Sequence, residues 1–344
     1  MNSLRKWAGV LARQWTWLKW IVAGALLVYL FDRHRADLER LGEHQIDWRF
    51  AALALMLCAS AIVSTFVRWY LLVWAQDFAF RLSDALRIGF IGYLFNYVAP
   101  GAVGGDLVKA VIIAREQTER RVVAMATVFL DRVLGLIGLF LVGAAAGLIA
   151  TPLRDVPQYR TVLVTFTVAG LCGLLGMAVV LHPAIPRARW VNALIHLPKV
   201  GGMIGGAINA VRLYQSRWMV LVAAVGISVV GHLMMLSSFY FVARALNPAE
   251  ASPSFAAHLQ FIPAAELAGV IVPLPGGIGA LEGAVAYYYE VAGSSSGEGF
   301  LTGIGYRAIT VIVAAVGAGY YLAARREVDE AMEEATHEST GVGP

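Results

Sequence analysis

Charged residues are scarce in this 344-residue sequence: Asp, Glu, Lys and Arg make up 15% of it, whereas hydrophobic residues make up 59%. An ordinary soluble domain carries about 25% charged residues, so the composition excludes that class and points to a membrane. Cysteine is scarce as well. Cys58 and Cys172 both lie inside apolar stretches, where a free thiol behaves as a small hydrophobic group.

Several motifs of soluble enzymes are missing. There is no His-Glu-x-x-His zinc motif, no Gly-x-x-x-x-Gly-Lys-Ser/Thr phosphate loop and no Cys-x-x-Cys pair. Without a phosphate loop, we do not expect the protein to obtain energy by hydrolysing ATP itself. We also expect no metal or other cofactor. The net charge of +4 is too small and too divided among loops to suggest nucleic acid binding.

Apolar stretches long enough to cross a bilayer, which takes about 20 residues, recur along the chain. They cover residues 50–74, 121–150, 160–182, 217–243 and 300–323, and a shorter one covers 20–31. The short stretch follows a basic segment but ends without a small-residue cleavage site, so we expect an uncleaved anchor. The sequence predicts an all-α polytopic membrane protein with about six full transmembrane helices.

The loops differ in charge. Positive residues cluster at 5–19, 109–121, 187–217 and 325–326, whereas 32–49 is near balance and 245–300 leans acidic. Basic loops stay in the cytoplasm, so six crossings place both termini there.

Two further apolar segments, 84–115 and 255–292, are each interrupted near the middle by proline and glycine. The first contains Pro100-Gly101-Ala-Val-Gly104-Gly105-Asp106, and the second contains Pro273-Leu-Pro275-Gly276-Gly277-Ile-Gly279-Ala-Leu-Glu282. Proline and clustered glycine end helices, and each half alone is too short to cross. We predict two re-entrant broken-helix hairpins.

The two halves of the chain also resemble each other. A shift of 175 residues aligns Pro100 with Pro275, Gly104 with Gly279 and Arg132 with Arg307. The intervening crossings point the two units in opposite directions, so we predict an inverted repeat of the kind found in secondary transporters. The expected organisation is an anchor and loop (1–49), repeat 1 (50–150), a connecting span with a basic interfacial segment or plain loop (151–216), repeat 2 (217–323) and a cytoplasmic tail (324–344) with a short helix followed by disorder.

Charges at membrane depth are costly and need a partner or water. Arg68 either extends its side chain to the cytoplasmic membrane interface or contributes to a functional site. Asp131 and Arg132 point about 100° apart on a helix, so they are unsuited to satisfying only each other, and both a functional role and an inter-helix ion pair remain open. His232 is more often a hydrogen-bonded residue between helices than a proton relay.

The second broken segment adds two carboxylates. Glu266 should be neutral or paired, and Arg307 is a partner for either Glu266 or Glu282, or a substrate contact. Glu282, one turn into its half-helix, also suits the helix dipole.

The first loop offers an anion site. Backbone N–H groups at Gly104, Gly105 and Asp106 begin a half-helix, and Lys109 lies one turn on, so a phosphate fits there. Asp106 has the simpler alternative of capping the helix.

These motifs resemble the membrane domain of lysylphosphatidylglycerol synthase/flippase proteins over nearly the whole chain. The resemblance rests on Arg68-Trp69, Asn96-x-x-x-Pro100-Gly101-x-x-Gly104-Gly105-Asp106-x-x-Lys109, Asp131-Arg132 and Pro273-x-Pro275-Gly276-Gly277-Ile278-Gly279-x-x-Glu282. It implies movement of a lipid between leaflets. Bifunctional members add a soluble aminoacyltransferase domain, which these residues do not contain, so we expect no lipid aminoacylation. Lys109 departs from the arginine expected in many relatives, and lysine gives up bidentate phosphate recognition.

We therefore expect a bacterial inner-membrane flippase or scramblase, not an enzyme, that moves a phospholipid, glycolipid or polyprenyl-linked lipid. The candidate assemblies are a homo-oligomer and a complex with a lipid or glycan biosynthetic enzyme. A membrane-embedded lipid-modifying enzyme and a non-transporting partner protein are the alternatives. The predicted head-group residues are Arg68, Asn96, Gly101, Gly104, Gly105, Asp106, Lys109, Asp131, Arg132, Glu266, Gly276, Gly277, Glu282 and Arg307.

Overall fold

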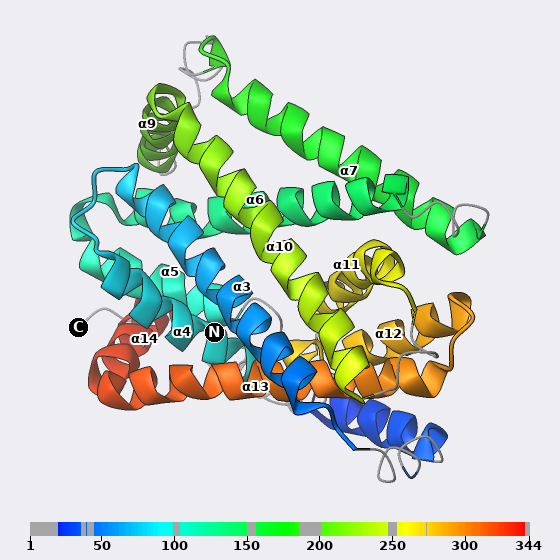
Figure 1. Ribbon diagram of the computed structural model, residues 1–344. Coiled ribbons are helices and arrows are strands. Elements are labelled where there is room, and N and C mark those ends of the chain that lie inside the picture. The colour runs from blue at the N-terminus through cyan, green and yellow to red at the C-terminus, as the bar shows by residue number, and fades with distance from the viewer. Residues whose placement is uncertain are drawn as a thin grey trace, which may run out of the picture.

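The computed structural model describes residues 20–35, 39, 45–98, 104–149, 156–185, 201–246, 253–272 and 274–340. Within these ranges the chain forms helices and no strand. The helices long and apolar enough to cross a membrane are α3 (Trp48–Trp74), α6 (Arg121–Ile149), α7 (Pro157–Leu181), α10 (Trp218–Leu246) and α13 (Ser296–Ala323). They confirm the all-α polytopic class (Figure 1).

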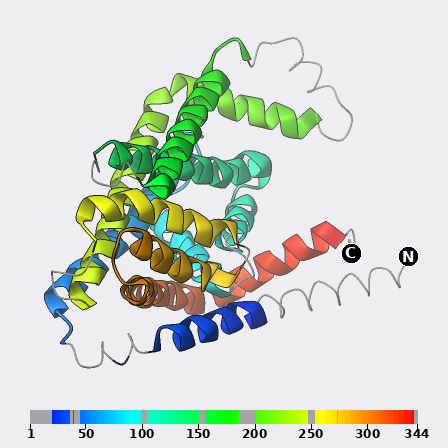
Figure 2. The ribbon, with the colours of Figure 1, turned by 90° about the vertical axis from the view of Figure 1, so that its right-hand side faces the viewer.

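The expected sixth crossing lies in the N-terminal segment, which is helical over 20–33 in the described residues. That part is about 21 Å long at 1.5 Å per residue, so a sixth full span stays a prediction. The helix packs through Leu30 against Ala286 and Phe300, and His34 stacks on the Phe300 ring at 5.1 Å between centroids. In Figure 2 it is the dark blue helix along the edge of the bundle.

Both interrupted segments form a helix, a break and a second helix. The first consists of α4 (Leu82–Val98) and α5 (Gly104–Glu116), and the second of α11 (Phe255–Ile271), a 3-10 turn η4 (Pro275–Gly277) and α12 (Ala280–Val291). The paired helices pack on each other. Each has 12 to 17 residues, or about 18 to 26 Å, short of a bilayer core of about 30 Å. Their re-entrant course in the membrane stays a prediction.

The two halves of the chain pack closely on each other, and their relation as an inverted repeat stays a prediction. The first helices of the two repeats, α3 and α10, pack along their length in opposite directions (Figure 1). At one end the Asp47 N–H donates to the Ala245 carbonyl at 3.0 Å, and at the other Arg217 Nη1 donates to the Ala75 carbonyl at 3.0 Å. Each hairpin also contacts a long helix of the opposite half of the chain. Helix α4 packs on α13, and helix α11 packs on α6.

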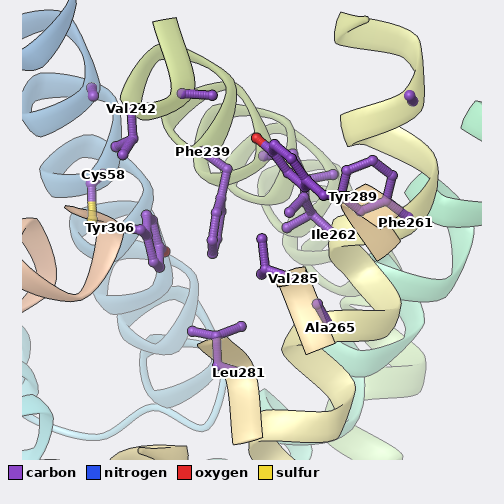
Figure 3. Close-up of a cluster of buried hydrophobic side chains, with 14 of the residues drawn as sticks. Cys58, Phe239, Val242, Phe261, Ile262, Ala265, Leu281, Val285, Tyr289 and Tyr306 are labelled. Carbon is purple, nitrogen blue, oxygen red and sulfur yellow. The ribbon is translucent and has the colours of Figure 1, made fainter. Parts of the chain in front are cut away.

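A buried apolar cluster holds repeat 2 against α3. It contains Cys58, Phe239, Phe261, Tyr289 and Tyr306 (Figure 3). The Phe239 and Tyr306 rings stack with centroids 3.6 Å apart, a contact that fixes α10 against α13. Aromatic pairs of this kind add to the dispersion energy of the core, and in a lipid solvent close packing drives helix association.

One end of the bundle collects basic residues, as the charge pattern predicts. Arg120 Nη1 donates to the Gln76 carbonyl at 2.9 Å, and Arg217 Nη2 lies 2.8 Å from Asp77. Helix α9 (Gly201–Ser216) packs at the same end, where Gln76 Nε2 donates to the Ala210 carbonyl. The part of the basic segment at 186–200 lies outside the described residues.

The C-terminal tail, for which we predicted a short helix and then disorder, contains one helix in its described part. Helix α14 covers Arg325–Thr340 and packs on α5, and Val328 and Ala331 are buried. Arg87 on α4 binds Glu327 at 2.8 Å and Glu116 on α5 at 3.0 Å. The polar composition of the tail hides a short apolar stripe, which an α5 surface covers.

Substitution of Val328 by Asn is expected to weaken the docking of α14 by about 1–3 kcal/mol, because the amide would be buried without a partner. Hydrogen exchange of the α14 amides measures this change, and faster exchange confined to α14 is expected. Arg326→Asn, at an exposed position of the same helix, is the control and should change the free energy by under about 0.5 kcal/mol. Equal exchange in the two variants would refute the docking.

Candidate functional site

A cavity of about 320 Å³ lies between helices from the two halves of the chain. Helices α3, α4, α5, α6, α10, α11, α12 and α13 and the second loop line it. Nine of the predicted head-group residues contribute to this lining: Arg68, Asn96, Asp106, Lys109, Asp131, Arg132, Glu266, Gly276 and Arg307. Residues from opposite halves of the sequence therefore meet around one space.

The other predicted residues have different places. Glu282 is fully buried behind Arg307 and does not line the cavity. Gly104 and Gly105 begin α5 and Gly277 ends η4, and these three residues do not line the cavity. Gly101 lies outside the described residues.

Arg68 forms a buried bridge between three helices. Its Nε lies 2.7 Å from Asp131 Oδ1 on α6, and its Nη1 donates to Ser228 Oγ on α10 at 3.0 Å. Both charged side chains are under 10% exposed. The alternative in which Arg68 snorkels to the interface was wrong, because a carboxylate on the neighbouring helix satisfies the guanidinium at depth.

A polar contact joins the two helices of the first hairpin. The Gly105 N–H donates to Asn96 Oδ1 at 3.0 Å, and a Cβ at Gly105 would meet the Gly92 carbonyl and Asn96 Oδ1. Glycine at 105 therefore permits α4 and α5 to approach backbone to backbone.

Asp106 gathers two cations beside that loop. Its carboxylate lies 2.7 Å from Arg132 Nη2 and 3.6 Å from Lys109 Nζ. Lys109 is buried, with Nζ 5.7 Å from the centroids of both the Phe66 and Trp69 rings. Since α5 begins at Gly104, Asp106 is its third residue, so the alternative of an N-cap role was wrong.

Arg307 holds the second loop. Its Nε lies 2.6 Å from Glu282 Oε1, while Nη1 and Nη2 donate to the carbonyls of Gly276 at 2.6 Å and Gly277 at 3.4 Å. Glu282 Oε2 also accepts the Gly279 N–H at 2.7 Å. Of the two pairings open from the sequence, the structure contains Glu282 with Arg307.

The glycines of this loop are needed for its backbone. Gly276, Gly277 and Gly279 have φ of 58°, 63° and 83°, which side chains rarely tolerate. A Cβ at Gly277 would also meet the backbone of Gly269. The loop thus packs directly on α11.

The two loops carry equivalent ion pairs. Asp106 is the third residue of α5 and Glu282 is the third residue of α12, and each pairs with an arginine on the long helix that follows. Arg132 and Arg307 match under the shift of 175 residues, and the carboxylates match within one residue. A carboxylate in the first turn also suits the positive end of the helix dipole.

The two pairs differ in exposure. The Arg132 side chain is 39% exposed, against 15% for Arg307. The first pair also has a second cation, Lys109, beside its carboxylate. The accessible positive charge of the cavity therefore lies on the side of the first loop.

His232 lines the cavity, but its hydrogen bonds are within its own helix. Nδ1 lies 2.7 Å from the Ser228 carbonyl, four residues earlier on α10, and 3.4 Å from Ser228 Oγ. We expected His232 to form a hydrogen bond to another helix, but its hydrogen bonds stay within α10.

Sequence reasoning missed several polar residues of the lining, among them Tyr93, Tyr97, Ser228 and Tyr306. The Tyr93 and Tyr97 hydroxyls are 3.3 Å apart, and the Arg307 guanidinium carbon lies 5.9 Å from the Tyr97 centroid. The spacing of Tyr93 and Tyr97 at i and i+4, next to Asn96, was the available signal.

Residues 293–297 match the Gly-x-Ser-x-Gly pattern of hydrolases, which sequence reasoning also missed. Here the pattern lies in a turn between α12 and α13, and Ser295 Oγ accepts the Gly297 N–H as the N-cap of α13. A nucleophile elbow needs a strand before the serine, so this serine has a capping role. In the described part of the chain, no group of three His, Cys, Asp or Glu residues is placed to hold a metal ion.

The fold and the lining of the cavity define a multi-pass α-helical membrane protein with two broken-helix hairpins. The chain matches the family model described as the lysylphosphatidylglycerol synthase TM region over residues 16–317, and it belongs to that family. This confirms the resemblance in the motifs and ties the protein to lipid modification or transport. No curated protein matches the chain.

Proposed function

We propose that the protein moves a lipid head group between leaflets through the cavity, as a flippase or scramblase. The observation that carries this proposal is the convergence of both broken hairpins on one charged cavity. In transporters with inverted repeats, substrates bind near the repeat interface beside discontinuous helices.

A phosphate of the head group would bind on the side of the first loop. Arg132 and Lys109 both lie against the Asp106 carboxylate there, so this group of three side chains carries a net positive charge that attracts an anion. Arg68 and Arg307 are less suited, because Asp131, Glu282 and the loop carbonyls already occupy their donors. Charge-assisted bonds to phosphate are among the stronger hydrogen bonds of proteins.

The size of the cavity favours a head group without its chains. A volume of 320 Å³ corresponds to about ten water molecules at about 30 Å³ each. This holds a small phosphate-bearing head group, while acyl chains would stay in the surrounding lipid. Exposed apolar side chains such as Phe129 on α6 suit such a lipid-facing surface.

The enzyme alternative has fewer supporting groups. A lipid-modifying enzyme would use Asp131, Glu266 or His232 as acid or base. Asp131 is paired with Arg68 and His232 is bonded to its own helix, so of these three groups only Glu266 is available for such a role. The basic end of the bundle favours a cytoplasmic location for that end, in a bacterial inner membrane. We also propose that the protein associates either with a second copy of itself or with a lipid or glycan biosynthetic enzyme.

Replacement of Arg132 by Ala is expected to slow leaflet exchange of a fluorescent phosphatidylglycerol by roughly 10- to 100-fold, since a charged hydrogen bond contributes about 1.5–3 kcal/mol. The measurement is the loss of fluorescence to a membrane-impermeant quencher in vesicles that contain the purified protein. Arg132→Lys should retain part of the rate, because it keeps charge but not the bidentate fork.

Arg160→Ala is the matched control, because this arginine is exposed on α7 and does not line the cavity. It should exchange lipid at the wild-type rate. Wild-type rates in Arg132→Ala and in Lys109→Ala would remove the phosphate site from the proposal.

A further inference from the structure

Glu266 differs from the other carboxylates at the cavity. Asp106, Asp131 and Glu282 each pair with an arginine. Within the described ranges of the chain, Glu266 lines the cavity with neither a hydrogen bond nor an ion pair. An ionised carboxylate without a partner at membrane depth is costly, so this one must hold a proton or a cation in the arrangement described.

Among the described groups, the cation that acts on Glu266 is Arg307, and it already has a carboxylate partner. The ionisable groups near it are Arg307, Glu282, Tyr306, Tyr93 and Cys58, with His232 on the same cavity. Arg307 gives its donors to Glu282 and to the carbonyls of Gly276 and Gly277. On α6, Asp131 is paired with Arg68, and the net positive charge of the cavity, on Arg132 and Lys109, lies against Asp106. A neutral Glu266 fits this setting.

The position of Glu266 links its charge to the second loop. It lies on α11 three residues after Pro263, which cannot donate a backbone hydrogen bond and so weakens the helix locally. Arg307 lines the same cavity as Glu266 while it holds the loop. An ionised Glu266 would compete with Glu282 and the loop carbonyls for this one guanidinium.

We propose that Glu266 is an exchangeable proton site that couples proton binding to the second loop. With the proton bound, Arg307 stays on Glu282, Gly276 and Gly277, as described. Release of the proton to water in the cavity leaves a carboxylate that draws Arg307 from the loop carbonyls, and the loop loosens from α13. The proton site stands on the geometry, and its effect on transport rests on the proposed function.

Infrared spectroscopy of the full-length protein in phosphatidylglycerol and phosphatidylcholine vesicles tests the site without reference to transport. The wild type should show a protonated-carboxyl band that disappears as the pH rises. Glu266→Gln should lack it, Glu266→Asp should retain one at a shifted midpoint, and Asp131→Asn should keep the wild-type band. An unchanged band in Glu266→Gln, or a band that responds to sodium and not to pH, would overturn the proposal.

The coupling is tested by leaflet exchange of the same fluorescent phosphatidylglycerol. The wild-type rate should change several-fold between mildly acidic and mildly alkaline pH, and the profile of Glu266→Gln should be flat whatever its absolute rate. A wild-type pH profile in Glu266→Gln would overturn the coupling. Absence of exchange in the wild type would instead remove the proposed function, and the infrared band would still decide whether Glu266 binds the proton.

Discussion

Substitution of Glu282 by Ala is expected to lower the free energy of unfolding by about 3–5 kcal/mol, because it leaves the Arg307 guanidinium without its carboxylate in a buried setting. The Glu282 side chain is 1% exposed and lies 2.6 Å from Arg307, so solvent screens little of the loss. The Gly279 N–H loses its acceptor as well. Unfolding in mixed micelles with a denaturing detergent, followed by tryptophan fluorescence, measures the change.

Two controls separate the ion pair from simple loss of packing. The double variant Glu282→Leu with Arg307→Met removes both charges and should recover much of the loss, since paired removal is far less costly than removal of one partner. Arg325→Ala removes one member of an exposed pair with Asp329 on α14, and should cost under about 1 kcal/mol. A loss for Glu282→Ala as small as that of Arg325→Ala would contradict the role of the buried pair.

Substitution of Gly105 by Ala is expected to destabilise the protein by about 2–4 kcal/mol, from overpacking and from loss of the bond to Asn96. The new Cβ would meet the Gly92 carbonyl, a backbone atom that cannot rotate away, and would lie 2.6 Å from Asn96 Oδ1. The same unfolding titration measures the change. Leaflet exchange should fall with it, because α5 carries Asp106 and Lys109.

The matched control is Gly226→Ala on α10, where an added Cβ meets no atom within 4 Å. Because alanine is the better helix former, this variant should gain about 0.5–1 kcal/mol. Equal stability of the two alanine variants would show that α4 and α5 do not depend on the close approach at Gly105.

Much of the fold was predictable from local patterns. Long apolar runs give the spanning helices, and Pro275 with Gly276 and Gly277 gives the second break, because glycine alone suits the positive φ found there. The docking of the tail helix was not predictable, since its apolar stripe acquires a partner only when α5 is in place. A helix with polar composition has no local signal for such docking.

The site was predictable in its residue types but not in its pairings. Charge at membrane depth marked Arg68, Asp131 and Arg132, and all three line the cavity. Their partners depend on how α3, α5 and α6 pack, which no spacing in the sequence encodes. Hence the pairing of Arg68 with Asp131, and of Arg132 with Asp106, became visible only in three dimensions.

The central claim is that a head group passes through the cavity, and a tryptophan that fills the cavity tests it most directly. Thr65 lines the cavity, whereas Val168 on α7 is 54% exposed outside it. In vesicles with fluorescent phosphatidylglycerol, Thr65→Trp should reduce leaflet exchange to the rate of protein-free vesicles, and Val168→Trp should leave it at the wild-type rate. Wild-type exchange in a stably folded Thr65→Trp variant would contradict the account.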